Sequence, residues 1–155
     1  MNEWPLKDLL PHREPMILID GVERFDAESK TLTARVTIDE KQIFFEGDGV
    51  PNWVAIEYMA QTSAALAGYW DKSLAPDQPA RPGLLLGTRK LDLNLDRFEA
   101  GQTYFITAVN AFSDADAASF DCSIATADGT VVATAILSAY RPPDLEQFLK
   151  EQAKA

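Results

Sequence analysis

Residues 44–61 of this 155-residue chain have the sequence Phe44-Phe45-Glu46-Gly47-Asp48-Gly49-Val50-Pro51-Asn52-Trp53-Val54-Ala55-Ile56-Glu57-Tyr58-Met59-Ala60-Gln61. After Pro51 the run is apolar and rich in small residues, which predicts a buried helix with Asn52 as its N-cap. One carboxylate, Glu57, lies inside this run. Because burial of an unpaired charge costs several kcal/mol, Glu57 must be neutralised, paired or used in chemistry.

The predicted helix extends over residues 52–72. Glu57, Gln61, Ala64, Ala65 and Gly68 recur at helical spacing on one side, so a polar pair is followed by a stripe of small residues. Small side chains allow a helix to lie close to a sheet. We therefore expect a sheet that wraps around this helix.

Strand patterns flank the helix on both sides. The alternation of Leu32, Ala34, Val36 and Ile38 predicts a strand, and residues 16–38 together predict a hairpin whose first strand lies in residues 16–19. Four more strands are predicted at residues 84–95, 102–112, 118–127 and 130–140, and short helices at residues 4–10 and 144–154. The order predicts one α+β domain, residues 1–155, with an antiparallel sheet around one central helix.

Composition excludes several classes of function. A net charge of −10 argues against nucleic-acid binding, which needs clustered Lys and Arg. No apolar run approaches the roughly 20 residues that span a bilayer, and the first residues do not have the pattern of a signal peptide. Cys122 is the single cysteine, so a disulfide within the chain and a cysteine metal site are excluded. We expect Cys122 to lie in the core and the protein to be cytoplasmic.

Three separated motifs resemble one known family. Residues 9–20, Leu-Leu-Pro-His-Arg-Glu-Pro-Met-Ile-Leu-Ile-Asp, are similar to the opening of the 3-hydroxyacyl-ACP dehydratases of fatty-acid synthesis, where ACP is acyl carrier protein. Residues 44–47 resemble the Phe-Phe-x-Gly segment of these enzymes, and residues 57–61 resemble their Glu-Ala-Met-Ala-Gln helix. The resemblance implies the hot-dog fold, which agrees with the predicted order of elements.

The resemblance also implies a chemistry, the removal of water from a 3-hydroxyacyl thioester on ACP, without a metal or cofactor. In the family a histidine and a helix glutamate from the other subunit of a dimer share the proton transfer, and backbone N–H groups at the helix start hold the thioester carbonyl. The matching acid here is Glu57. The residues expected to bind substrate are Gly47, Asn52, Trp53 and Gln61. A buried acid satisfied by hydrogen bonds is the alternative interpretation of Glu57, and packing is the alternative for Gln61.

The catalytic histidine of the family is missing. Its position in the turn is occupied by Asp48, which is the candidate replacement base, although Asp48-Gly49 is also an ordinary turn dipeptide. Ordinary pKa values are about 3.9 for Asp and about 6.5 for His, so Asp48 would be a weaker base at neutral pH. Loss of a general base typically lowers a rate by roughly 10²–10⁴. The single histidine, His12, belongs to the opening motif, and we interpret it as structural.

Several functions remain open at this point. The chain could act alone as a dehydratase, act as a hot-dog thioesterase, or bind acyl-ACP without catalysis. It could also act as one half of a heterodimer with a histidine-bearing paralogue, since it resembles the divergent dehydratase branch, without the catalytic histidine, that serves as partner subunits in aryl polyene-type lipid pathways. A homodimer and a heterodimer are both compatible with a shared site. The acidic chain disfavours docking of acidic ACP, but a local basic rim is available from Arg81, Arg89, Lys90 and Arg97.

Overall fold

The computed structural model describes residues 4–114 and 116–154. Its elements are α1 (Leu6–Leu9), β1 (Gly21–Asp26), β2 (Thr31–Thr37), β3 (Gly49–Pro51), the 3-10 turn η1 (Asn52–Val54), α2 (Ala55–Leu74), β4 (Leu84–Leu93), β5 (Arg97–Glu99), β6 (Thr103–Asp114), β7 (Ala117–Thr126), β8 (Val131–Tyr140) and α3 (Leu145–Ala153). Six strands form one antiparallel sheet in the order β1-β2-β6-β7-β8-β4.

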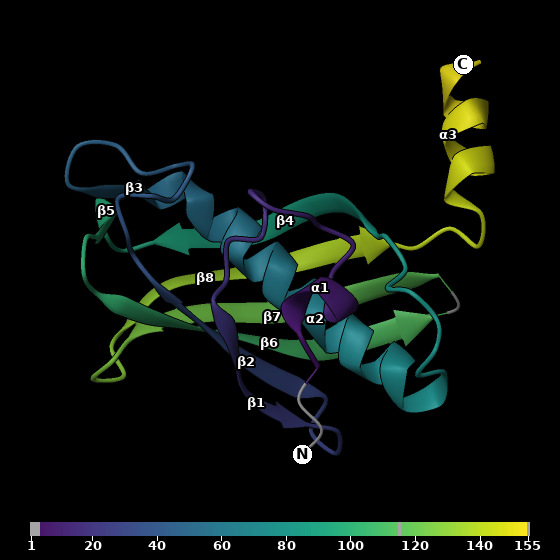
Figure 1. Ribbon diagram of the computed structural model, residues 1–155, viewed down its shortest axis with the longest axis horizontal. Helices are drawn as coiled ribbons and strands as arrows, with labels where there is room; N and C mark the ends of the chain where they lie inside the picture. Colours follow the sequence, from purple (N-terminus) through teal and green to yellow (C-terminus); the bar gives the residue numbers. More distant parts are fainter. Residues whose placement is uncertain (1–3, 115, 155) are drawn as a thin grey trace.

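The long helix α2 lies across one face of this sheet, and α1 lies against α2 on the side away from the sheet (Figure 1). Alternate residues of the central strands face α2, as the period of a half-buried strand requires. They include Leu32, Ala34 and Val36 of β2 and Ile106 and Ala108 of β6, all fully buried. This is the expected α+β hot-dog arrangement.

The start of the helix differs from the prediction. The segment Asn52–Val54 forms a 3-10 turn and α2 itself begins at Ala55. Asn52 does not cap the helix, because its side-chain amide donates a hydrogen bond of 3.0 Å to the carbonyl of Leu95. The N-cap prediction for Asn52 is therefore wrong, and its side chain instead joins the helix start to the loop after β4.

The first predicted strand is also wrong. The apolar residues 16–19 form no strand, and the hairpin is instead built from β1 and β2, with the polar turn at residues 26–30 as predicted. The backbone of residues 16–19 is bound by a side chain of α2: the Leu18 N–H and the Met16 carbonyl both bond to Gln61. The side chains of Leu18 and Ile19 are buried in the core, whereas Met16 is exposed.

A second, two-stranded sheet was not predicted. It pairs β3 with β5 and places Val50 opposite Phe98. The strands approach so closely at Gly49 that an added Cβ would lie 2.1 Å from the Phe98 carbonyl oxygen, so this position needs glycine. Phe98 then packs edge-to-face on Tyr58 of α2, with ring centroids 5.2 Å apart, and thereby anchors the small sheet to the core.

Gly68 allows the close approach of α1 to α2. A Cβ added to Gly68 would lie 2.3 Å from the backbone carbonyl oxygen of Leu9, which is buried at the end of α1. The small-residue stripe thus accommodates the N-terminal segment at this position, rather than the sheet. This contact fixes the segment that leads from α1 toward residues 16–19.

Gly68→Ala is expected to lower the free energy of unfolding by about 1–3 kcal/mol through overpacking. The clash outweighs the gain in helix propensity, which is about 1 kcal/mol. Urea unfolding measures the difference. Gly87→Ala is the matched control, because a Cβ at Gly87 meets no heavy atom within 4 Å. Equal stability of the Gly68→Ala and wild-type proteins would contradict the close contact.

Candidate active site

Glu57 lies in the first turns of α2 with its carboxylate directed at two polar side chains. Gln61 Nε2, one helical turn further, donates a hydrogen bond of 2.9 Å to Glu57 Oε1. His12 Nε2 lies 3.6 Å from the same oxygen. The Glu57 side chain is 33% exposed, so the acid is neither isolated in the core nor free on the surface.

Gln61 is fully buried and its amide binds on both sides. Its Oε1 accepts a hydrogen bond of 2.8 Å from the Leu18 N–H, and its Nε2 also donates one of 2.6 Å to the Met16 carbonyl. One side chain therefore positions Glu57 and fixes residues 16–18 on α2. This arrangement supports the orienting role over simple packing.

The surroundings of Glu57 act on its pKa in opposite directions. Burial raises the pKa, whereas the neighbouring His12 side chain and the hydrogen bond from Gln61 lower it. The net effect holds the pKa of Glu57 below its ordinary value of 4.5. At neutral pH Glu57 is therefore an ionised carboxylate, which can accept a proton.

The sequence interpretation did not place His12 beside Glu57. The segment between α1 and residue 16 passes over the first half of α2 and brings the imidazole to the carboxylate. Because His12 and Glu57 are 45 positions apart, no local sequence pattern could reveal that they lie side by side. The resemblance pointed away from it as well, since the matching histidine of the family is not the catalytic one.

His12 and Glu57 line one end of a cavity of about 510 Å³. The cavity follows α2, whose contributing residues recur at helical spacing and are mostly small: Ala60, Ser63, Ala64, Leu66, Ala67 and Trp70. Its opposite wall is apolar and comes from the sheet, with Leu84, Leu85, Ala118, Phe120, Leu137 and Ala139. The axial rise from Glu57 to Trp70 is about 20 Å at 1.5 Å per residue. The cavity can therefore hold an extended apolar chain whose head lies at Glu57.

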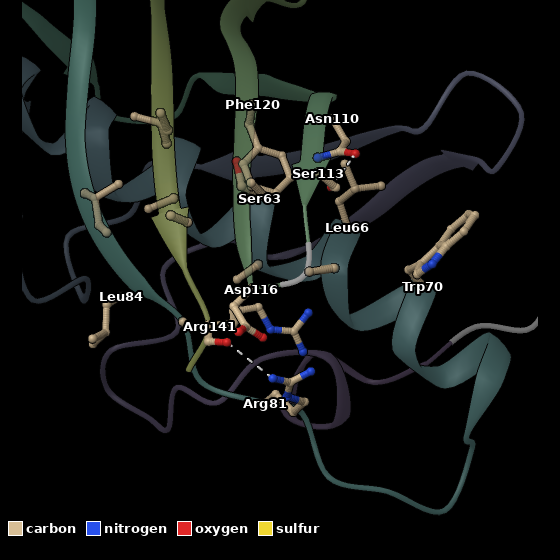
Figure 2. A pocket seen from close by; sticks show the side chains of 18 of the residues that line it. Ser63, Leu66, Trp70, Arg81, Leu84, Asn110, Ser113, Asp116, Phe120 and Arg141 are labelled. Atoms are coloured by element: carbon tan, nitrogen blue, oxygen red, sulfur yellow. Dashed lines mark hydrogen bonds between the residues drawn. The ribbon is translucent and has the colours of Figure 1, made fainter. Parts of the chain in front are cut away.

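The far end of the cavity is polar. Figure 2 shows Arg81, Asp116 and Arg141 close together there, with Trp70 set apart from them on α2. Arg141 is ion-paired with Asp71 of α2, and its backbone carbonyl accepts a hydrogen bond from Arg81. Its Nε is buried without a hydrogen-bond partner among the residues that the structure describes. Arg81 was a candidate for a basic rim, and the structure places it at this end.

Of the predicted site residues, Glu57 lines this cavity, whereas the other five, Gln61, Asp48, Gly47, Asn52 and Trp53, are not among the residues that line it. Asp48 is 89% exposed and pairs with Arg97 at 3.0 Å, beside Gly47, whose φ is +65°. Asn52 bonds to the carbonyl of Leu95, and Trp53 is mostly exposed, with its ring edge-to-face on Phe44. These residues gather near β3 and β5, at the start of α2. The structure thus joins Glu57 and Gln61 to His12, while roles for Asp48, Gly47, Asn52 and Trp53 stay predictions.

Further observations concern residues other than Glu57, Gln61 and His12. Cys122 is buried as predicted, and burial raises the pKa of its thiol to about 11, so the thiol stays protonated at neutral pH. Within residues 4–114 and 116–154, no three His, Cys, Asp or Glu side chains lie close enough to hold a metal ion. Over the same residues, no helix has the length and apolarity to cross a membrane.

Comparison with known families gives a match over nearly the whole chain. The model of a family named ApeP-like, described as ApeP dehydratase, matches residues 4–150. A curated relative, the 3-hydroxyacyl-[acyl-carrier-protein] dehydratase FabZ of Chlamydia pneumoniae, is 34% identical over 90 residues, which are 55% of this chain and 57% of the relative. The alignment thus spans little more than half the length of that relative.

Comparison with solved structures supports the same fold. The dehydratase heterocomplex ApeI:P from Xenorhabdus doucetiae has a chain that superposes with a TM-score of 0.85 and 28% identity, covering 96% of this chain and 97% of that chain. A hypothetical thioesterase with coenzyme A from Streptococcus pneumoniae superposes with a TM-score of 0.58 at 12% identity, over 78% of this chain and 84% of that chain. The second likeness shows the fold alone.

The lowered pKa of Glu57 predicts a specific pH dependence of stability. A carboxyl group with a depressed folded-state pKa stabilises the fold above its ordinary value of 4.5, and this contribution is lost as the pH falls through the folded-state pKa. In urea unfolding between about pH 7 and about pH 3, the wild type should therefore lose more stability than Glu57→Gln. Identical pH dependence of the two proteins would contradict the depressed pKa.

Proposed function

Because this chain belongs to the ApeP-like dehydratase family, we propose that it is a dehydratase subunit that removes water from a 3-hydroxyacyl thioester carried on acyl carrier protein. The observation that supports this proposal best is the position of Glu57. An ionised carboxylate, oriented by a buried amide, lies at the head of an apolar cavity along α2. The curated relative is named as an enzyme of this reaction.

The geometry suits the chemistry of this elimination. A 3-hydroxyacyl chain that enters the cavity from the Glu57 end brings C2 and C3, next to the thioester, to the carboxylate. Glu57 accepts the C2 proton, the electron pair of that C–H bond forms the C2–C3 double bond, and the C3 hydroxyl leaves as water once a second group protonates it. The apolar wall keeps other water away from these atoms.

We further propose that the working protein is a heterodimer with a paralogous, histidine-bearing subunit. The similar solved structure is a dehydratase heterocomplex. In this chain, β4 forms one edge of the main sheet, so one row of its backbone N–H and C=O groups faces away from β8. Leu85, Leu86 and Leu91 on β4 are exposed, with Leu86 at 64%. An exposed leucine-bearing edge strand suits pairing with a second subunit.

Glu57→Gln tests the reaction. In the complex of this chain with the paralogue from the same source, the variant should lower dehydration of 3-hydroxyacyl-ACP by roughly 10²–10⁴, measured against the activity of the paralogue alone. Glu28→Gln, in the exposed turn between β1 and β2, is the matched control and should keep the wild-type rate. Full activity of the Glu57→Gln complex would contradict the proposed function.

Leu86→Lys tests the interface. A lysine there places a charge on the proposed subunit contact and should prevent assembly with the paralogue, as measured by size-exclusion chromatography with light scattering. Leu74→Lys changes an equally apolar and more exposed residue, 76% exposed at the end of α2, and should leave assembly intact. Normal assembly of the Leu86→Lys chain would argue against β4 as the contact.

A further inference from the structure

Hydrogen bonds hold the segment that carries His12. Arg13 Nη1, on the next residue, donates hydrogen bonds of 3.2 Å and 2.8 Å to the carbonyls of Leu10 and His12. Further along the segment, Gln61 binds Met16 and Leu18. The backbone around His12 is therefore tied by hydrogen bonds, and the amide that binds the segment after His12 also binds Glu57.

The His12 ring is placed for proton transfer in the cavity. Its Nε2 lies 3.6 Å from Glu57 Oε1, which is within ion-pair distance but longer than a normal hydrogen bond. Both side chains line the cavity, and His12 is 27% exposed. Its Nδ1 is buried and makes no hydrogen bond within the part of the chain that the structure describes. Two separate groups can thus face two neighbouring atoms of a substrate.

We propose that His12 is the catalytic acid of this site and acts within the same chain as Glu57. This inference rests on the proposed dehydratase function, and it assigns the second proton carrier of that reaction. It departs from the family pattern, in which the histidine comes from the turn that Asp48 occupies here. Both proton carriers of this site then come from this chain, so the site does not depend on a histidine from the partner.

The proposed step balances as follows. The Glu57 carboxylate takes the C2 proton, and the electron pair of the C2–H bond becomes the C2–C3 double bond. The C3–O bond breaks, and its oxygen takes the proton from the His12 imidazolium and leaves as water. Proton return from Glu57 to solvent and from solvent to His12 restores both groups, so no oxidant, reductant or metal enters the step.

The charged neighbours favour this division of roles. Glu57 is ionised, as a proton acceptor must be, and His12 Nε2 lies within ion-pair distance of its carboxylate. Among the causes that shift the pKa of Glu57, His12 is the single titratable side chain. The other charged groups that line the cavity are Lys30, Arg81, Asp116 and Arg141. Arg81, Asp116 and Arg141 gather at its polar end (Figure 2), where Arg141 pairs with Asp71 in the last turns of α2.

The test uses His12→Ala and His12→Gln in the complex with the paralogue, with thermal unfolding to verify that both variants are folded. Both should lower dehydration by roughly 10²–10⁴, to the level of the Glu57→Gln complex. The wild-type rate should fall with rising pH on the alkaline side, because a catalytic acid must carry its proton. This dependence should disappear in the His12 variants. Added imidazole should restore activity to His12→Ala in proportion to its protonated form.

Lys7→Gln is the matched control, because it removes one exposed basic side chain from the same N-terminal segment. It should keep the wild-type rate and pH profile. The proposal is overturned if a folded His12→Ala complex retains the wild-type rate, or if its loss of rate comes without a changed pH profile and without rescue by imidazole. A fully active Glu57→Gln complex would instead overturn the dehydratase function itself, so the two failures are distinguishable.

Discussion

The buried amide of Gln61 is the interaction on which the rest of the site depends. It accepts from Leu18, donates to Met16 and donates to Glu57, so one side chain joins the N-terminal segment, the central helix and the reactive carboxylate. A buried amide left without these partners would cost about 1–3 kcal/mol for each unsatisfied group. The same contacts therefore hold both the fold and the site together. Gln61 orients Glu57, and it also holds the segment that carries His12 on α2.

The fold follows from the sequence wherever a pattern repeats. The alternation in β2 and the small and apolar run of α2 predicted these elements with small errors at the ends. The prediction failed where a long-range contact replaced a local one. Residues 16–19 have the composition of a strand, but they pair with a side chain of α2 rather than with a strand. The β3–β5 sheet spans only three residues in each strand, too few for a period to show.

The site was predictable only in part, for the same reason. Glu57 and Gln61 were identified because they are one helical turn apart and polar within an apolar run. His12 lies 45 positions away, and nothing in its neighbourhood in the sequence points to a carboxylate. Asp48 was chosen because it occupies the histidine position of a known motif, yet the structure places it on the surface beside Arg97. A motif match indicates which residue could have a role. The direction of its side chain depends on contacts with residues that are distant in the sequence.

The exposed edge strand β4 also has a consequence for how this protein is produced in a cell. A ten-residue strand with exposed leucines and unpaired backbone groups is a template on which any other extended chain can add, including another copy of itself. A surplus of this chain over the proposed partner would therefore be prone to aggregation. If the proposed heterodimer forms, we expect cells to synthesise its two subunits in matched amounts.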